Sequence, residues 1–255
     1  MKIFFVTDLE GIAGAECWEQ TREEGELKNQ SMVQLTKEVN ACVDGILDAE
    51  PQAEVVVWDG HGSEGIIKDD FHPKAEYVRE SGVHGNFDKS FDALFFVGQH
   101  AMVGTAFAPL AHTYSSRTIS YYRLNGYFVG EFSMRAAYAG SIGVPTVFIS
   151  GDDKCVMSAR TFVPEIYGAV VKWGLGLQKA KHLSSDEACQ VIREVATEAT
   201  RNIDKVQPLI IEPPYEFEAR YYNPRDFSND EREGLTQIDE RTIVIKTDDF
   251  LKLPL

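Results

Sequence analysis

Residues 4–11 read FFVTDLEG, an apolar run that ends in two carboxylates, Asp8 and Glu10, and a glycine. A nearly continuous apolar run of this kind is typical of a strand that is buried on both faces of a parallel sheet. Side chains two positions apart in a strand point to the same face, so the two acids project together. Because like charges repel at this separation, the pair predicts a cation between them.

Three further stretches share the character of the first. They are short, rich in Val, Ile and Phe, and end in polar residues: AEVVVWDGH (53–61), ALFFVGQH (93–100) and PTVFISGDD (145–153). Amphipathic helical patterns lie between some of them, at residues 31–50 and 131–142. The alternation of strands and helices predicts an α/β fold, in which helices flank a mostly parallel sheet with a Rossmann-like core.

The rest of the chain has a different pattern. In residues 120–131, β-rich runs flank an Asn-Gly dipeptide, which predicts a hairpin. After residue 180, Ser184 and Glu187 form a capping box at the start of a predicted helix, and two predicted strands, FEARYY and RTIVIKT, follow. We therefore expect a metal-binding α/β core over residues 1–180, including the hairpin, and a smaller α+β portion over residues 181–255.

The composition disfavours several classes of function. The formal net charge at pH 7 is −15, whereas nucleic acids and anionic membranes require a basic surface. The apolar runs are too short to span a bilayer or to form a signal peptide. The four cysteines show no CxxC spacing. We expect reduced thiols in a cytoplasmic protein that binds neither nucleic acid nor membrane.

The ends of the predicted core strands and of the hairpin carry residues that bind metals or transfer protons. The candidates are three carboxylates and two histidines: Asp8, Glu10, Glu131, His61 and His100. In open α/β sheets, ligands bind beyond the carboxyl ends of the strands, so these side chains can meet there. The set suits one or two Zn²⁺ ions or similar first-row divalent metals. Five candidates without a useful cysteine favour two metals that share one carboxylate and activate water.

Each of these residues also has a structural explanation when it is considered alone. Asp8 fits a helix N-cap, His61 fits a turn, and His100 fits a hydrogen-bonded buried histidine. His112, in a loop among Thr and Ser, is either a general acid/base or an ordinary loop residue. The acidic pair at residues 152–153 either supports the site or caps the next helix. The same chemistry at several strand ends favours the metal site.

Seven motifs together resemble the zinc-dependent D-aminopeptidases of the bacterial dipeptide-operon type. In chain order they are VTDLEG, LTKEVNACVDG, WDGHG, FFVGQHA, LAHTYSS, NGYFVGE and GVPTVFISGDD, and they cover residues 1 to about 180. The resemblance implies a dinuclear zinc exopeptidase that acts on short peptides with an N-terminal D-amino acid, such as D-Ala-D-Ala. It also implies a homo-oligomer, such as a decameric ring with internal catalytic chambers.

The resemblance assigns roles to individual residues. It implies two zinc ions per subunit with Asp8 as the bridge, His112 as the catalytic histidine, and four further ligands: Glu10, His61, His100 and Glu131. Two positions depart from the family pattern, since Arg135 and Gly65 stand where asparagines are expected. The chain also ends soon after its last predicted strand, where the family has a helix. Arg135 is a candidate substrate-binding residue that favours a carboxylate-bearing peptide.

Two other functions fit the same residues. A dinuclear phosphoesterase uses a similar ligand set, as do other metal amidohydrolases. A phosphoesterase also needs cations to hold the phosphate, and the strand ends supply almost none. A non-catalytic binding protein that retains the metal is the third possibility, and the complete set of six site residues argues against it. Metal content combined with turnover distinguishes the three.

Overall fold

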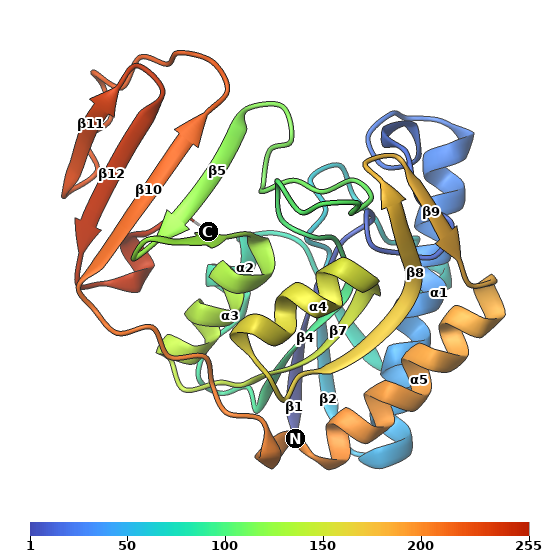
Figure 1. Cartoon of the computed structure of the whole chain (residues 1–255). Helices are drawn as coiled ribbons and strands as arrows, with labels where there is room; N and C mark the ends of the chain where they lie inside the picture. Colours follow the sequence, from blue (N-terminus) through green and yellow to red (C-terminus); the bar gives the residue numbers. More distant parts are fainter. Residues whose placement is uncertain (255) are drawn as a thin grey trace.

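The computed structural model describes residues 1–254, which form two sheets flanked by helices (Figure 1). The larger sheet consists of β1 (Lys2–Thr7), β2 (Glu54–Trp58), β3 (Ala75–Val78), β4 (Ala93–Gln99), β7 (Thr146–Asp152), β8 (Tyr167–Gly176) and β9 (Lys179–His182). Their order across the sheet is β3-β2-β1-β4-β7-β8-β9. All neighbours are parallel except β9, which runs antiparallel to β8 at one edge. The predicted α/β fold with a mostly parallel sheet is confirmed.

The smaller sheet is entirely antiparallel. It consists of β5 (Ile119–Leu124), β6 (Tyr127–Val129), β10 (Tyr215–Tyr221), β11 (Leu235–Asp239) and β12 (Thr242–Thr247). In this sheet β5 pairs with both β6 and β10, so the hairpin joins the C-terminal strands. The predicted hairpin turn is present, with Asn125 and Gly126 at φ values of 50° and 84°.

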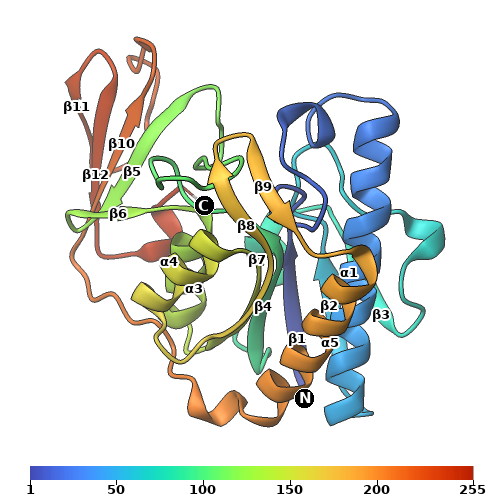
Figure 2. The same ribbon diagram turned by 45° about the vertical axis from the view of Figure 1, so that its right-hand side comes forward.

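Helices cover both faces of the larger sheet. The described α-helices are α1 (Glu26–Ala49), α2 (Gly82–Asn86), α3 (Glu131–Ser141), α4 (Asp153–Phe162) and α5 (Ser185–Arg201), and the 3₁₀ turns are η1 (Trp18–Gln20), η2 (Lys68–Asp70), η3 (Ile203–Lys205) and η4 (Phe250–Lys252). The long helices α1 and α5 pack against each other on one face, and α3 and α4 lie on the other (Figure 2). This double cover explains why the core strands are apolar at successive positions.

Ser31 and Gln34, which have the spacing of a capping box, lie inside α1, so capping spacing predicts only the start of α5 correctly. The helix predicted over residues 31–50 begins five residues earlier, at Glu26. Its first turn contains the exposed Leu27 and the buried Lys28, so it lacks the apolar spacing that marks the rest of the helix. Ser184 caps α5 and forms the predicted capping box with Glu187.

Segments from both sides of residue 180 contribute to each half of the structure. The hairpin of β5 and β6 lies in the smaller sheet, whereas α5 packs on α1 of the larger one. The division into units at residue 180 stays a prediction. The structure also contains β3, β8, β9 and β11, which were not predicted. The strands β3, β9 and β11 are only partly buried and carry many polar residues, and the apolar run of β8 is interrupted by Lys172 and three glycines.

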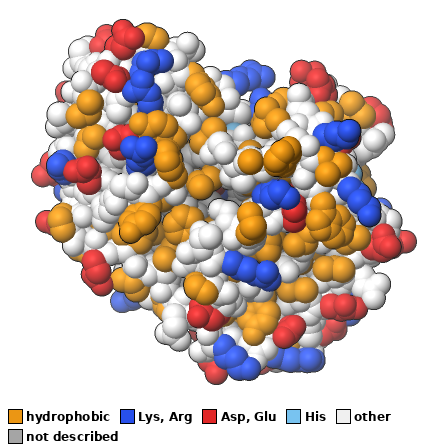
Figure 3. Space-filling model, in the orientation of Figure 1, with side chains coloured by type: hydrophobic (Ala, Val, Ile, Leu, Met, Phe, Trp, Pro, Cys, Tyr) orange, Lys and Arg blue, Asp and Glu red, His pale blue; other side chains and the backbone are white. Residues whose placement is uncertain are grey.

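The surface carries exposed apolar side chains among its charges (Figure 3). One group lies on the β8–β9 hairpin and the loop beside it, where Phe107, Leu175 and Leu177 are 69%, 52% and 55% exposed. The two segments are joined by a hydrogen bond from the Leu110 amide to the Leu177 carbonyl (2.7 Å). No helix within the described range has the length and apolarity needed to cross a membrane.

The ends of β1 and β4 interlock through two glycines. Gly98 has a φ of +76°, and a Cβ on it would lie 2.1 Å from the carbonyl oxygen of Asp8. A Cβ on Gly11 would lie 2.1 Å from the carbonyl oxygen of Gln99, and the Gly11 amide donates to the Gly98 carbonyl at 2.7 Å. These contacts hold the acids after β1 beside the histidine after β4.

We therefore expect Gly98→Ala to lower the free energy of unfolding by at least about 2 kcal/mol, because it adds a backbone clash to an unfavourable φ. Urea denaturation of the metal-free protein measures the change. Gly176→Ala is the matched control, since its Cβ would meet nothing closer than 3.9 Å. Equal denaturation midpoints for the two variants would show that the strand ends do not interlock as described.

Candidate metal centre

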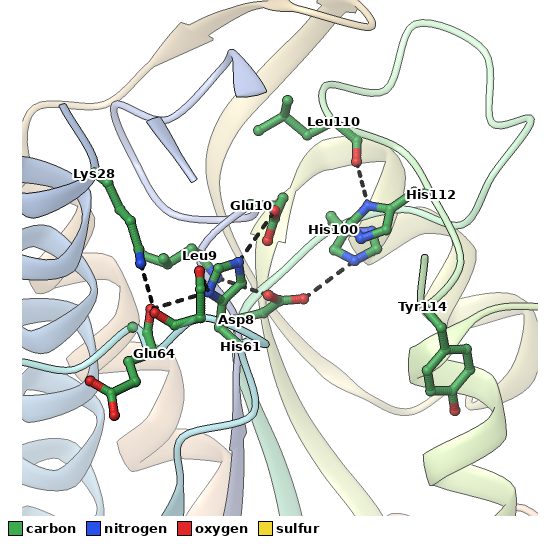
Figure 4. Close-up of polar contacts among 12 residues, drawn as sticks. Asp8, Leu9, Glu10, Lys28, His61, Glu64, His100, Leu110, His112 and Tyr114 are labelled. Carbon is green, nitrogen blue, oxygen red and sulfur yellow. Dashed lines mark hydrogen bonds and ion pairs between the residues drawn. The ribbon is translucent and has the colours of Figure 1, made fainter. Parts of the chain in front are cut away.

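All six predicted site residues lie together beyond the carboxyl end of the larger sheet. Figure 4 labels Asp8, Glu10, His61, His100 and His112 among them. Asp8 and Glu10 follow β1, His61 follows β2, and His100 follows β4. Glu131 is the first residue of α3, directly after the hairpin, and His112 comes from the loop between β4 and β5. Five of the six are buried, and His61 is half-buried. The fold thus brings together residues that lie far apart in the chain.

The six side chains form two groups of three. Within each group the potential ligand atoms lie within 4.8 Å of one another: Asp8, Glu10 and His61 in one, His100, His112 and Glu131 in the other. The groups meet at Asp8, whose Oδ2 lies 3.3 Å from His100 Nε2. Asp8 is therefore a carboxylate of one group that also lies against a histidine of the other.

The backbone sets the orientation of the three imidazole rings. In each ring Nδ1 faces a main-chain carbonyl oxygen: His61 faces that of Glu64 (3.1 Å), His100 that of Ala101 (2.9 Å) and His112 that of Leu110 (2.8 Å). A carbonyl oxygen only accepts, so Nδ1–H is the donor and Nε2 faces the acids. Metal-binding histidines are commonly fixed in this way.

The acids and histidines strongly perturb one another. Burial, together with the charge of Glu10, raises the pKa of Asp8 to about 7. Burial alone would lower the pKa of His61, but the hydrogen bond and charge of Glu10 outweigh it and raise that pKa to about 9. The pKa of Glu131 is lowered, since its contacts with His100 exceed the opposing effect of burial. The site strongly favours positive charge among its carboxylates.

Two buried polar atoms at the centre have no hydrogen-bond partner. Glu10 Oε2 is one, and His100 Nε2 is the other. The latter lies 3.3 Å from Asp8 and 3.2 Å from Glu131 without a well-directed hydrogen bond to either. Orphaned atoms of this kind are costly unless an ion completes them. The carboxylate and imidazole donors fit a first-row divalent cation such as zinc.

His112 differs from the other two histidines. Its ring stacks on that of His100, with centroids 3.8 Å apart and planes inclined by 13°. It also makes a T-shaped contact with Trp18, with ring centroids 5.7 Å apart. Burial, followed by the charge of His100, lowers the pKa of His112 to about 4. The ring is therefore neutral near pH 7, with Nε2 3.8 Å from Glu131 Oε1. A neutral, fixed imidazole suits proton transfer.

Several neighbouring polar residues hold the structure around the site. Asp152 caps α4 by accepting from the amides of Lys154 (2.9 Å) and Cys155 (3.0 Å), so the capping interpretation is confirmed. Asp59, at the end of β2, accepts from the Gly65 amide (3.1 Å) and so shapes the loop that carries His61.

Sequence reasoning missed Lys172. Its side chain is fully buried, and its Nζ donates to the carbonyl oxygens of Glu10 and of Ala15 (2.6 Å). It thereby fixes the loop that presents Glu10. The available signal was a lysine within the apolar run AVVKW of β8, since a buried lysine requires specific partners.

A cavity of about 410 Å³ is lined by five of the six residues, all except His100. Its wall includes Arg135, which lies one helical turn after Glu131 and contacts Glu131 Oε2 through a terminal nitrogen at 3.1 Å. Arg22 and Arg117 also line it, and sequence reasoning missed both. The strand ends supply none of these cations, as predicted, but two loops and α3 do.

Comparisons with known proteins agree with one another. A profile of the M55 peptidases, described as D-aminopeptidase, matches residues 1–254. A D-aminopeptidase of Bacillus subtilis (strain 168) is 28% identical over 216 residues, covering 82% of this chain and 77% of that protein. The solved structure described as Zn-dependent D-aminopeptidase DppA from Bacillus subtilis, a self-compartmentalizing protease, matches with a TM-score of 0.88 at 24% identity, covering 99% of this chain and 93% of that one. The last likeness confirms the fold.

The geometry predicts that Glu10→Ala and His61→Ala each weaken zinc binding by more than about 100-fold, because each removes a donor that contacts the metal. Competition with a chromophoric chelator measures the affinity. His72→Ala is the control, since its imidazole pairs with Asp44 away from the cavity. Unchanged zinc affinity in both test variants would contradict the assignment.

Proposed function

The chain belongs to the M55 peptidase family, described as D-aminopeptidase, and we propose that it is a dinuclear zinc aminopeptidase that hydrolyses short peptides with an N-terminal D-amino acid, such as D-Ala-D-Ala. The observation that carries this proposal is the pair of three-residue groups that meet at Asp8. Zinc is the proposed metal because the donors suit it and because the solved relative is described as Zn-dependent.

Five residues would hold the two ions. We assign Asp8 as the bridge, Glu10 and His61 to one ion, and His100 and Glu131 to the other, following the two groups and the orientation of the imidazoles. When bound, the zinc pair lowers the pKa of a water molecule towards neutrality and polarises the scissile carbonyl.

We assign His112 to proton transfer. Its Nδ1–H is held by the Leu110 carbonyl, and stacking on His100 and contact with Trp18 fix the ring plane. Nε2 is therefore the atom that accepts a proton from the attacking water and donates it to the departing amine nitrogen. Burial, the largest cause of its lowered pKa, does not depend on the state of His100, so the ring begins the reaction neutral and competent to accept.

A dinuclear phosphoesterase is the second candidate, and the arginines of the cavity favour it. Arg22, Arg117 and Arg135 supply the cations that phosphate recognition needs. Family membership favours amide hydrolysis instead, so phosphodiester cleavage is included in the test below.

We also propose that the protein is a homo-oligomer, such as a decameric ring. The solved relative is described as self-compartmentalizing, and the exposed apolar group around Phe107, Leu175 and Leu177 offers a surface for contact between copies. The cytoplasmic location stays a prediction, and the four cysteines are free thiols.

His112→Ala should reduce kcat by roughly 10²–10⁴-fold while both zinc ions remain bound, because it removes the proton carrier and leaves the five assigned ligands. Stopped assays of peptide hydrolysis give kcat, and elemental analysis gives zinc per subunit. A loss of one zinc in this variant would make His112 a ligand instead.

The proposed function predicts that zinc-loaded protein releases D-alanine from D-Ala-D-Ala and leaves L-Ala-L-Ala intact. Removal of zinc by a chelator should abolish the release, and added zinc should restore it. Bis(p-nitrophenyl) phosphate is assayed in parallel. Cleavage of the phosphodiester without cleavage of either dipeptide would overturn the aminopeptidase assignment in favour of the phosphoesterase.

A further inference from the structure

Three arginines line the same cavity as the metal centre, and they come from separate parts of the chain. Arg22 follows η1, Arg117 lies in the loop before β5, and Arg135 lies on α3. The carboxylates among the described lining residues are Asp8, Glu10 and Glu131, and all three are assigned to metal. The described wall therefore holds three guanidinium groups and no carboxylate outside the metal centre.

Arg135 has unused hydrogen-bonding capacity. It is 6% exposed, and its guanidinium carbon lies 5.2 Å from the ring centroid of Trp58 and 5.3 Å from that of Tyr114. Its one ion pair joins a terminal nitrogen to Glu131, whereas its Nε is buried without a partner. An arginine held this rigidly with an open donor is preorganised for a planar anion such as carboxylate.

Arg22 also has a buried guanidinium nitrogen without a hydrogen-bond partner. Its guanidinium carbon lies 3.2 Å from the ring centroid of Trp18. Burial lowers its pKa and the positive charge of Arg117 adds to this effect, against the charge of Glu10. If divalent ions neutralise the three carboxylates, no carboxylate of the described lining is left to pair with the arginines.

We infer that Arg22, Arg117 and Arg135, the arginine cluster, bind a carboxylate of the substrate, namely the C-terminal carboxylate of a dipeptide. The inference rests on the proposed aminopeptidase function. A cavity of about 410 Å³ is near the lower end of small-molecule sites, which span roughly 300–1,000 Å³. In a dipeptide the free carboxylate lies one residue from the scissile amide, so both fit within one such cavity.

The test compares D-Ala-D-Ala with its C-terminal amide, which lacks the negative charge. Zinc-loaded wild-type protein should prefer the acid by roughly 10- to 100-fold in kcat/KM, mainly through KM, because charge-assisted hydrogen bonds are lost with the amide. Arg135→Gln and Arg22→Gln should each reduce this preference at least about fivefold. Arg160→Gln is the control, because Arg160 is exposed on α4 and does not line the cavity.

Binding without turnover provides a second readout. The analogue of D-Ala-D-Ala in which CH₂ replaces the scissile C=O cannot be hydrolysed, and calorimetry gives its affinity as the acid and as the amide. The two arginine variants should lose affinity for the acid and keep that for the amide. Zinc per subunit is measured in each variant, because Arg135 contacts the ligand Glu131. Among the described residues, Arg22 forms no ion pair with any of the proposed metal ligands. Its variant therefore separates recognition of the substrate charge from retention of the metal.

The outcomes separate this inference from the proposed function. Hydrolysis of acid and amide at equal rates would overturn the inference and leave the aminopeptidase standing. If neither the acid nor the amide were hydrolysed, the proposed function itself would be wrong. If D-Glu-D-Ala amide were cleaved much faster than D-Ala-D-Ala amide in an arginine-dependent manner, the cluster would bind a side-chain carboxylate, and the C-terminal assignment would be wrong.

Discussion

Three carboxylates buried beside one another at the end of the larger sheet impose the constraint on which the site depends. Asp8, Glu10 and Glu131 are 6%, 2% and 8% exposed, and mutual repulsion is strong where water is excluded. The histidines offset part of this charge, since contact with the acids raises the pKa of His61 and His100. The two divalent ions that we propose would offset it fully and would bind the buried atoms that lack partners.

A charge cluster of this density needs a rigid backbone around it. The interlocked glycines bring the ends of β1 and β4 into direct contact, so the Asp8 and His100 side chains start from adjacent main-chain positions. Main-chain carbonyls set each imidazole, and Lys172 ties the loop of Glu10 to β8. Most of these supports are backbone groups or buried side chains. The site is therefore built by the same strand ends that build the core, and its geometry depends on their register.

The sequence reveals those parts of this arrangement that follow from local pattern. Asp8 and Glu10 are two residues apart after an apolar run, and His61, His100 and Glu131 each end a predicted strand or hairpin, so their convergence could be predicted from the topology of parallel sheets. His112, by contrast, owes its place to a loop whose path no periodicity describes. Arg22 and Arg117 also lie in loops, and the pairing of β5 with β10 joins strands almost a hundred residues apart. These contacts depend on tertiary packing alone.

The overall acidity of the chain and the arginines of the cavity act over different distances. The net charge of −15 repels anions at long range, but salt screens exposed charges beyond roughly 8 Å at physiological ionic strength. Inside the cavity, the nearby charged groups determine the electrostatic potential that a bound anion meets. Without metal, the three carboxylates face three arginines as well as the protonated His61 and His100. Two divalent ions would add positive charge to the same wall, so under the proposed function metal loading and the binding of an anionic substrate would be thermodynamically coupled: each would strengthen the other by the same factor.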